Sequence, residues 1–135
     1  MARVRRLFRT IWNIPYYTKQ WNLALQAQQE GDWLLVEQIM AELHERRLQT
    51  DDSHFMRGCA LMNLEQWEDA LAEFERIRGQ LDTKSNEGKR WVNQGIALAR
   101  LRREAEAAAL LRSQMSKEWS PEQLRKAEQL IDQLG

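Results

Sequence analysis

The chain has 135 residues, of which 43% are hydrophobic and 30% charged, a composition typical of one soluble globular domain. Lysine plus arginine and aspartate plus glutamate number 20 each, so no global positive field indicates a nucleic-acid binder. The scarcity of proline and glycine favours helices over a turn-rich β-sandwich or barrel. The single cysteine excludes an internal disulfide framework and favours a reducing compartment such as the cytoplasm.

The N-terminal segment, residues 1–15, is predicted to form a basic amphipathic helix. It contains no acidic residue, and its apolar side chains recur at helical spacing on one face. We expect the helix to run from about Arg3 to Asn13 and to break at Ile14 and Pro15, because a residue that precedes proline avoids the α conformation. The residues assigned to membrane or partner docking are Arg3, Arg5, Arg6, Leu7, Phe8, Arg9, Ile11 and Trp12.

Three interpretations of this N-terminal segment stay open. A helix this short is marginal in water and needs a surface to lie on. It can cover the apolar face of the helices that follow, or lie on an anionic membrane surface with its arginines at the headgroups. A targeting sequence is the third and least favoured interpretation, because serine and an apolar central stretch are absent.

An internal repeat follows. Trp33 and Trp67 are 34 residues apart, and each follows a short turn between two amphipathic stretches. A third copy is displaced by 37 residues, so that Gly58 corresponds to Gly95. We expect the extra residues of this copy to form a loop within the polar stretch 82–88.

The repeated positions alternate between small and large side chains. Small residues let paired helices approach closely where they cross, and large residues fill the space that remains. The predicted small contacts are Gly58, Ala70, Gly95 and Ala107. The predicted large contacts are Leu61, Phe74, Leu98 and Leu111.

On these residues the chain resembles the tetratricopeptide repeat family. The middle copy fits best, with Gly58, Leu61, Trp67, Ala70 and Phe74 at the family's small, large and aromatic positions. The resemblance implies an all-α, right-handed α-solenoid of three helix hairpins in residues 16–119. The hairpins are placed at about 17–50, 51–84 and 88–119.

The predicted helices of these hairpins span residues 16–29 and 33–45, 52–63 and 67–81, and 88–101 and 104–116. A capping helix is expected in residues 120–135. It opens with Ser120 at the N-cap, Pro121 at the first helical position and Gln123 in a capping box. Its apolar face is expected to cover the end of the solenoid, with Lys126 on the solvated side.

The resemblance also implies a concave surface built from the first helix of each hairpin. The residues expected to bind a partner there are Trp21, Leu25, Gln28, Phe55, Cys59, Met62, Asn63, Lys89, Val92, Ile96 and Arg100. This set is largely apolar, which suits an amphipathic helix or apolar segment of a protein partner. Self-association, with the groove filled by a second copy or by the N-terminal helix, stays open as the alternative.

No sequence motif indicates catalysis, and we expect neither an enzyme nor a cofactor, metal or small-molecule substrate. Glycine-rich phosphate loops and metal-ligand motifs are absent. The run from Asp51 to His54 is interpreted as a helix N-terminus rather than a catalytic triad. The acidic residues Glu65, Glu68, Asp69 and Glu73 are interpreted as a solvated face.

The sequence therefore predicts a non-catalytic, cytoplasmic scaffold or adaptor that binds a protein partner on its concave face. The first alternative is a membrane-peripheral assembly or tethering factor held by the N-terminal helix. The second is a nucleic-acid binder, which the third repeat suggests only weakly because acidic residues dilute its basic stripe. That stripe consists of Lys89, Arg90, Arg100, Arg102, Arg103 and Arg112.

Overall fold

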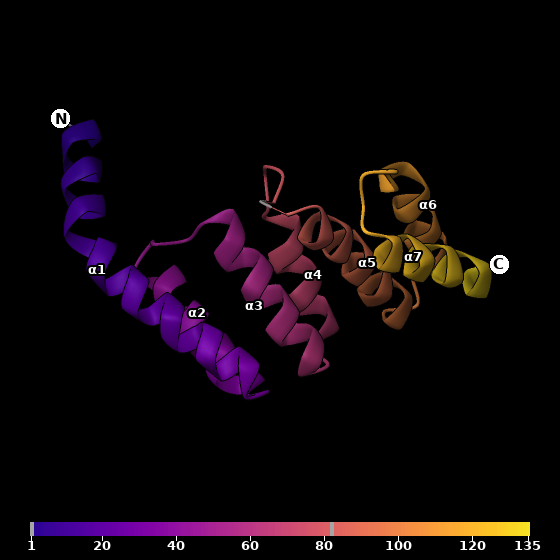
Figure 1. The fold of residues 1–135 in the computed structure, drawn as a ribbon, viewed down its shortest axis with the longest axis horizontal. Helices are drawn as coiled ribbons and strands as arrows, with labels where there is room; N and C mark the ends of the chain where they lie inside the picture. The colour runs from indigo at the N-terminus through magenta and orange to yellow at the C-terminus, as the bar shows by residue number, and fades with distance from the viewer. Residues whose placement is uncertain (1, 82) are drawn as a thin grey trace. The chain divides into compact units, whose positions relative to one another are not determined.

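The computed structural model describes the backbone of residues 2–81 and 83–135, and the side chains of residues 14–81, 83 and 85–135. The chain divides into two compact units, Met1–Gln49 and Thr50–Gly135. Every regular element in the described backbone is an α-helix, and no strand occurs there (Figure 1). The predicted all-α class is therefore confirmed.

The first unit holds helices α1 (Ala2–Gln29) and α2 (Trp33–Glu45). The second unit holds α3 (Asp51–Asn63), α4 (Trp67–Glu75), α5 (Lys84–Arg100), α6 (Glu104–Gln114) and α7 (Pro121–Leu134). The two repeated tryptophans begin α2 and α4, as predicted. Helices α4 and α6 end earlier than predicted, and α5 begins earlier.

Helix α1 continues through Pro15, so the predicted break at Ile14 and Pro15 is wrong. A proline inside a helix removes one backbone hydrogen bond and crowds the preceding turn, which bends the helix when both flanks stay helical. Figure 1 shows α1 bending part-way along its length.

The turns inside the three helix pairs share one geometry. Each has a residue with positive φ, namely Gly31 at 73°, Glu65 at 58° and Arg102 at 61°. The N–H group of this residue donates to the carbonyl three positions back, and the next N–H group donates to the carbonyl five positions back. This is the Schellman motif that commonly ends helices. The three residues are 34 and 37 positions apart, which are the predicted spacings of the repeat.

The small and large positions of the repeat meet inside the hairpins as predicted. A Cβ atom added at Gly58 would lie 2.6 Å from Cε1 of Phe74. A Cβ atom added at Gly95 would lie 3.0 Å from Cδ1 of Leu111, so the third repeat has the same contact with a more flexible partner. The remaining members of the predicted set are also buried: Leu61, Ala70, Leu98 and Ala107.

Long-range hydrogen bonds fix the connection that follows α4. The carboxylate of Asp51, at the start of α3, accepts from the backbone N–H groups of Arg78 at 3.1 Å and Gly79 at 2.9 Å. The guanidinium of Arg90, on α5, donates to the carbonyls of Ile77 at 3.1 Å and Gly79 at 3.2 Å. These side chains bond backbone groups of residues 77–79 that would otherwise form the next turn of α4. The helix therefore ends at Glu75, before the predicted end at residue 81.

The irregular segment between α4 and α5 therefore includes residues 76–81, and the predicted loop at 82–88 is wrong. Thr83 is the N-cap of α5, and its side chain accepts a hydrogen bond from the N–H group of Asn86 at 3.0 Å. Most of the polar stretch that was predicted as a loop is consequently the first turn of α5.

Helix α7 begins at Pro121, as predicted, and packs against both α5 and α6. The side chain of Ser120 accepts from the N–H group of Gln123 at 3.4 Å. Oε1 of Gln123 is buried without a hydrogen-bond partner, so only half of the predicted capping box forms. Within the described part of the chain, no helix has both the length and the apolar composition needed to cross a bilayer.

Candidate partner-binding groove

Helices α5 and α7 lie side by side and run in the same direction. Near their N-terminal ends, a Cβ atom added at Gly88 would lie 2.9 Å from Cβ of Gln123. Near their C-terminal ends, Leu134 packs against a buried cluster that contains Ala97 and Leu98. The two helices therefore form parallel walls over most of their length.

A groove of about 520 Å³ lies along these two helices. The α5 wall contributes residues at helical spacing, which are Val92, Ile96, Ala99 and Arg100. The α7 wall contributes a matching stripe, which is Lys126, Gln129, Leu130, Gln133 and Leu134. Five of these nine side chains are apolar, so the groove offers an apolar floor with polar groups along its sides.

The charged groups that line the groove are both positive. The guanidinium carbon of Arg100 lies 5.4 Å from the ring centroid of Trp67, a cation–π contact. Nζ of Lys126 lies 3.2 Å from Oε1 of Glu122, in a pair whose side chains are both largely exposed. Exposed pairs of this kind contribute only about 0–1 kcal/mol, so Lys126 can exchange that partner for another carboxylate.

The four partner-binding residues predicted on α3 have different environments. Phe55 packs against the core, with its ring centroid 6.2 Å from that of Phe74. Asn63 is exposed, and its side-chain amide donates to the backbone carbonyl of Cys59 at 2.9 Å. Met62 is partly buried against the core, and Cys59 is buried.

Cys59 lies beneath the surface rather than on it. It is 4% exposed, and Nδ2 of Asn93 on α5 lies 3.8 Å from its Sγ atom. Burial raises the pKa of the thiol to about 11, and the charge of Lys89 and the hydrogen bond from Asn93 only partly oppose this effect. The side chain of Cys59 therefore stays a neutral thiol that links α3 to α5.

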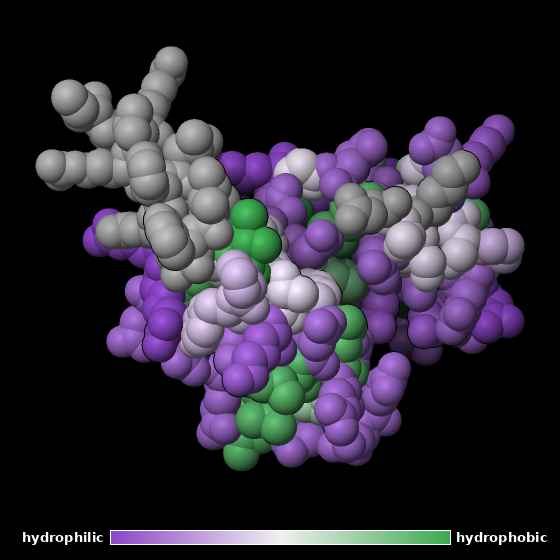
Figure 2. Space-filling model, turned by 60° about the vertical axis from the view of Figure 1, so that its left-hand side comes forward, coloured by the Kyte–Doolittle hydropathy of each residue, from purple (hydrophilic) through white to green (hydrophobic). Residues whose placement is uncertain are grey.

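The predicted partner-binding residues of the first unit lie along one edge of α1. Trp21 stacks on Tyr17, with ring centroids 5.9 Å apart and an angle of 12° between the planes. Leu25 is exposed, and Gln28 is partly buried. Figure 2, in which the first unit comes forward, shows apolar side chains at the surface among polar ones.

The residues assigned to the N-terminal docking helix have side chains outside the described residues, although their backbone is part of α1. These residues are Arg3, Arg5, Arg6, Leu7, Phe8, Arg9, Ile11 and Trp12.

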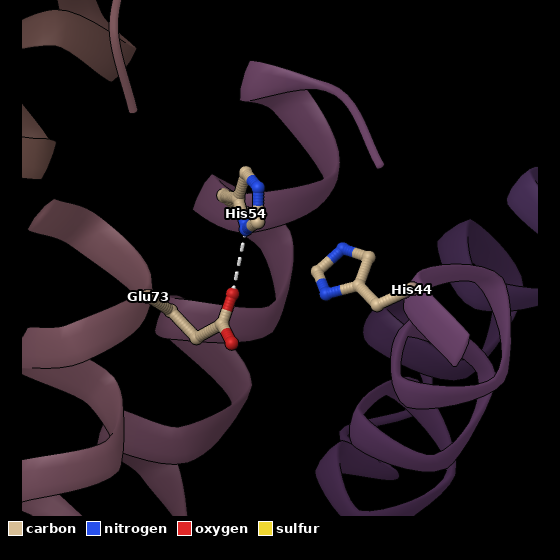
Figure 3. Close-up of side chains that lie close together, drawn as sticks. All are labelled: His44, His54 and Glu73. Carbon is tan, nitrogen blue, oxygen red and sulfur yellow. Dashed lines mark hydrogen bonds and ion pairs between the residues drawn. The ribbon is translucent and has the colours of Figure 1, made fainter. Parts of the chain in front are cut away.

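The interpretation of Glu73 as a solvated residue is wrong, because its side chain is only 3% exposed. Its carboxylate lies 2.7 Å from Nδ1 of His54 (Figure 3), 2.9 Å from the guanidinium of Arg57 and 2.8 Å from that of Arg76. The carboxylate thus joins α3 to α4. The signal in the sequence is its place beside Phe74, on the flank of the buried face of α4.

The predicted run from Asp51 to His54 is the N-terminus of α3, as expected. Thr50 and Ser53 form a reciprocal capping box, with bonds of 3.0 and 2.7 Å.

The basic residues of the third repeat do not form a continuous surface stripe. Arg90 is buried, and its guanidinium lies 4.0 Å from the ring centroid of Trp91. Arg103 pairs with Glu106 at 2.9 Å through Nε. Arg90 is thus held inside the chain, Arg103 forms an exposed pair, and Arg100 both lines the groove and contacts Trp67.

The α7 wall of the groove was missed in the sequence, where Lys126 was assigned to the solvated side. The signal was present: Lys126, Leu130 and Leu134 recur at intervals of four, as Val92, Ile96 and Arg100 do on α5. Helix α7 thus presents a stripe like that of a repeat's first helix.

Comparison of the chain with known protein families and with curated proteins found no match.

Proposed function

We propose that the chain is a non-catalytic protein-interaction module that binds an amphipathic or apolar segment of a partner in the groove between α5 and α7. The observation that carries the proposal is that residues expected to bind a partner line the groove found in the structure. The resemblance to tetratricopeptide repeats implies that Val92, Ile96 and Arg100 bind a partner, and the same residues line the groove. A concave, mostly apolar site with a few polar groups is the usual form of a binding site.

The proposed architecture is a right-handed solenoid of tetratricopeptide-like hairpins. The shared turn geometry at spacings of 34 and 37 residues supports this proposal. The contacts of α5 with both α3 and α7 support it as well, since the first helices of neighbouring repeats adjoin in a stack. In this account α7 takes the place beside α5 that the first helix of a further hairpin would take.

The test is affinity capture from the native host with the full chain, followed by mass spectrometry. Ile96→Glu places a charge on the apolar floor, and Gln133→Trp fills the groove from an exposed position. Ala109→Glu, on the exposed side of α6, is the matched control. We expect a partner that both groove variants lose and the control retains. If no captured protein follows this pattern, the groove is not the binding site.

A membrane-peripheral tether is the second candidate. The observation that favours it is that large apolar side chains are exposed in the first unit, whose sequence begins with a segment rich in arginine. Flotation with anionic vesicles tests it directly. Binding that Arg5→Glu/Arg9→Glu abolishes and Ile96→Glu leaves intact supports the tether, whereas no binding to vesicles rejects it.

A further inference from the structure

The charges of the α5–α7 groove narrow the class of partner. Among the nine residues that line it there are two cations, two amides and no carboxylate. Any helix or peptide that lies on the apolar floor therefore meets positive charge from Arg100 on one wall and Lys126 on the other. A partner with carboxylates at those places gains electrostatic attraction, and one with lysine or arginine there is repelled.

The two cations stand at opposite ends of the groove. Because Gly88 lies beside Gln123, Lys126 is level with Trp91, and Arg100 is nine residues further along α5. At a rise of 1.5 Å per residue, the backbone positions of the two residues are about 13 Å apart along the groove. This distance corresponds to roughly two and a half turns of a bound helix, with one acidic residue near each end of its apolar stripe.

A helical partner suits these walls better than an extended one. An extended peptide gains most of its affinity by pairing its backbone with a free sheet edge, and the described part of the chain contains no strand. A helix satisfies its own backbone hydrogen bonds and needs only an apolar surface for one face. The apolar floor formed by Val92, Ile96 and Leu130 provides that surface.

This inference rests on the proposed function of the groove. We propose that the partner segment is an acidic amphipathic helix of two to three turns. Its apolar face covers the groove floor, and its terminal carboxylates contact Arg100 and Lys126. The weak exposed pair between Lys126 and Glu122 is replaced on binding.

The probes are three fourteen-residue peptides, acetylated and amidated, with leucine at the fourth, seventh, eighth and eleventh positions. They differ at the third and twelfth positions, which flank the leucine stripe on opposite edges and carry glutamate, glutamine or lysine. Affinity for the full chain is measured by titration calorimetry at low and high salt. We expect the glutamate peptide to bind about 3- to 10-fold tighter than the lysine peptide, and high salt to reduce this ratio.

The decisive variant is Arg100→Glu/Lys126→Glu, which should reverse the preference so that the lysine peptide binds more tightly. Arg112→Glu/Arg125→Glu changes the net charge equally at exposed positions outside the groove, and should keep the original preference. Thermal melts of both variants check that each one folds. A reversal in the control as well would show that the preference comes from net charge and would overturn the proposal.

The possible failures are distinguishable. If all three peptides bind equally and Ile96→Glu abolishes their binding, the acidic partner is rejected and the groove function stands. If no peptide binds and partner capture also fails, both are rejected. If sedimentation shows a dimer of the chain that Ile96→Glu dissociates, a second copy occupies the groove and the acidic partner is rejected.

Discussion

The two units differ in the exposure of their large apolar side chains. The first unit is the hairpin of α1 and α2, and the second unit contains the other five helices. In the described part of the chain, the exposed large hydrophobic residues are Ile14, Leu23, Leu25, Leu34 and Leu35, all in the first unit. In the second unit the large hydrophobic residues are buried or partly buried, in successive clusters along the helices. Taken by itself, the α1–α2 hairpin has one face between helices, whereas α5 of the second unit packs against α3, α4, α6 and α7.

The largest expected effect tests this comparison in the core. Phe74 is fully buried against Gly58, so Phe74→Ala should lower the free energy of unfolding by about 3–5 kcal/mol. Leu34 in the first unit is 54% exposed, and Leu34→Ala should change it by less than about 0.5 kcal/mol. Urea unfolding curves of both variants measure the difference. Equal losses would mean that the two units are packed alike.

The next effect concerns the carboxylate that joins α3 to α4. Glu73→Gln keeps the shape of the side chain but removes the charge that holds His54, Arg57 and Arg76. We expect a loss of about 3 kcal/mol, the lower end of the range for a broken buried pair, because Arg76 is largely exposed. Glu75→Gln, at an exposed position of the same helix, is the control. A variant as stable as the control would show that the buried charge contributes nothing.

A smaller difference in stability is expected between alanine substitutions at Gly58 and Gly95, which are equivalent positions of the second unit. Gly58→Ala brings a methyl group against the rigid ring of Phe74, whereas Gly95→Ala meets the flexible end of Leu111. We expect the first substitution to cost about 1–2 kcal/mol more than the second. Melting temperatures of the two variants measure the difference. The opposite order would contradict the equivalence of the two crossings.

The last prediction concerns the ionisation of the buried Cys59 thiol, which contributes little to the stability of the fold at neutral pH. Because its pKa is raised to about 11, its thiolate fraction at pH 8 should be about 200-fold below that of a free cysteine. Alkylation of the native chain by iodoacetamide, followed by mass spectrometry, should be slower by at least this factor and should accelerate as pH rises towards 11. Modification at the rate of a free thiol would show that Cys59 is accessible.

The raised pKa of Cys59 also predicts that the folded chain becomes less stable at alkaline pH. The folded chain holds the Cys59 proton more tightly than the unfolded chain does, so this stabilisation is complete below about pH 8.5. It is lost as pH rises from there through 11. Cys59→Ala should remove this alkaline dependence.

Local signals predicted the helices well. The tryptophans that begin α2 and α4, the serine N-cap of α7 and the glycine contacts with Phe74 and Leu111 act over short distances or recur at a fixed period. Such signals can be read from one sequence because each depends on residue type and spacing alone.

The errors have a common physical cause, which is contact between residues distant in the chain. The early end of α4 depends on Asp51 and Arg90, and the burial of Glu73 depends on Arg57 and His54. Local periodicity contains no record of such pairs. The α7 wall was missed for another reason: its residues recur at helical spacing, but which neighbouring helix they face cannot be read from that spacing.

The central claim is that the chain binds partners between α5 and α7, and amide chemical-shift mapping tests it most directly. The labelled full chain is titrated with the glutamate peptide, and each backbone amide signal is followed. We predict shifts concentrated in residues 89–100 and 123–134, with the signals of residues 14–45 unchanged. Shifts confined to α1 and α2, or no shifts at saturating peptide, would contradict the claim.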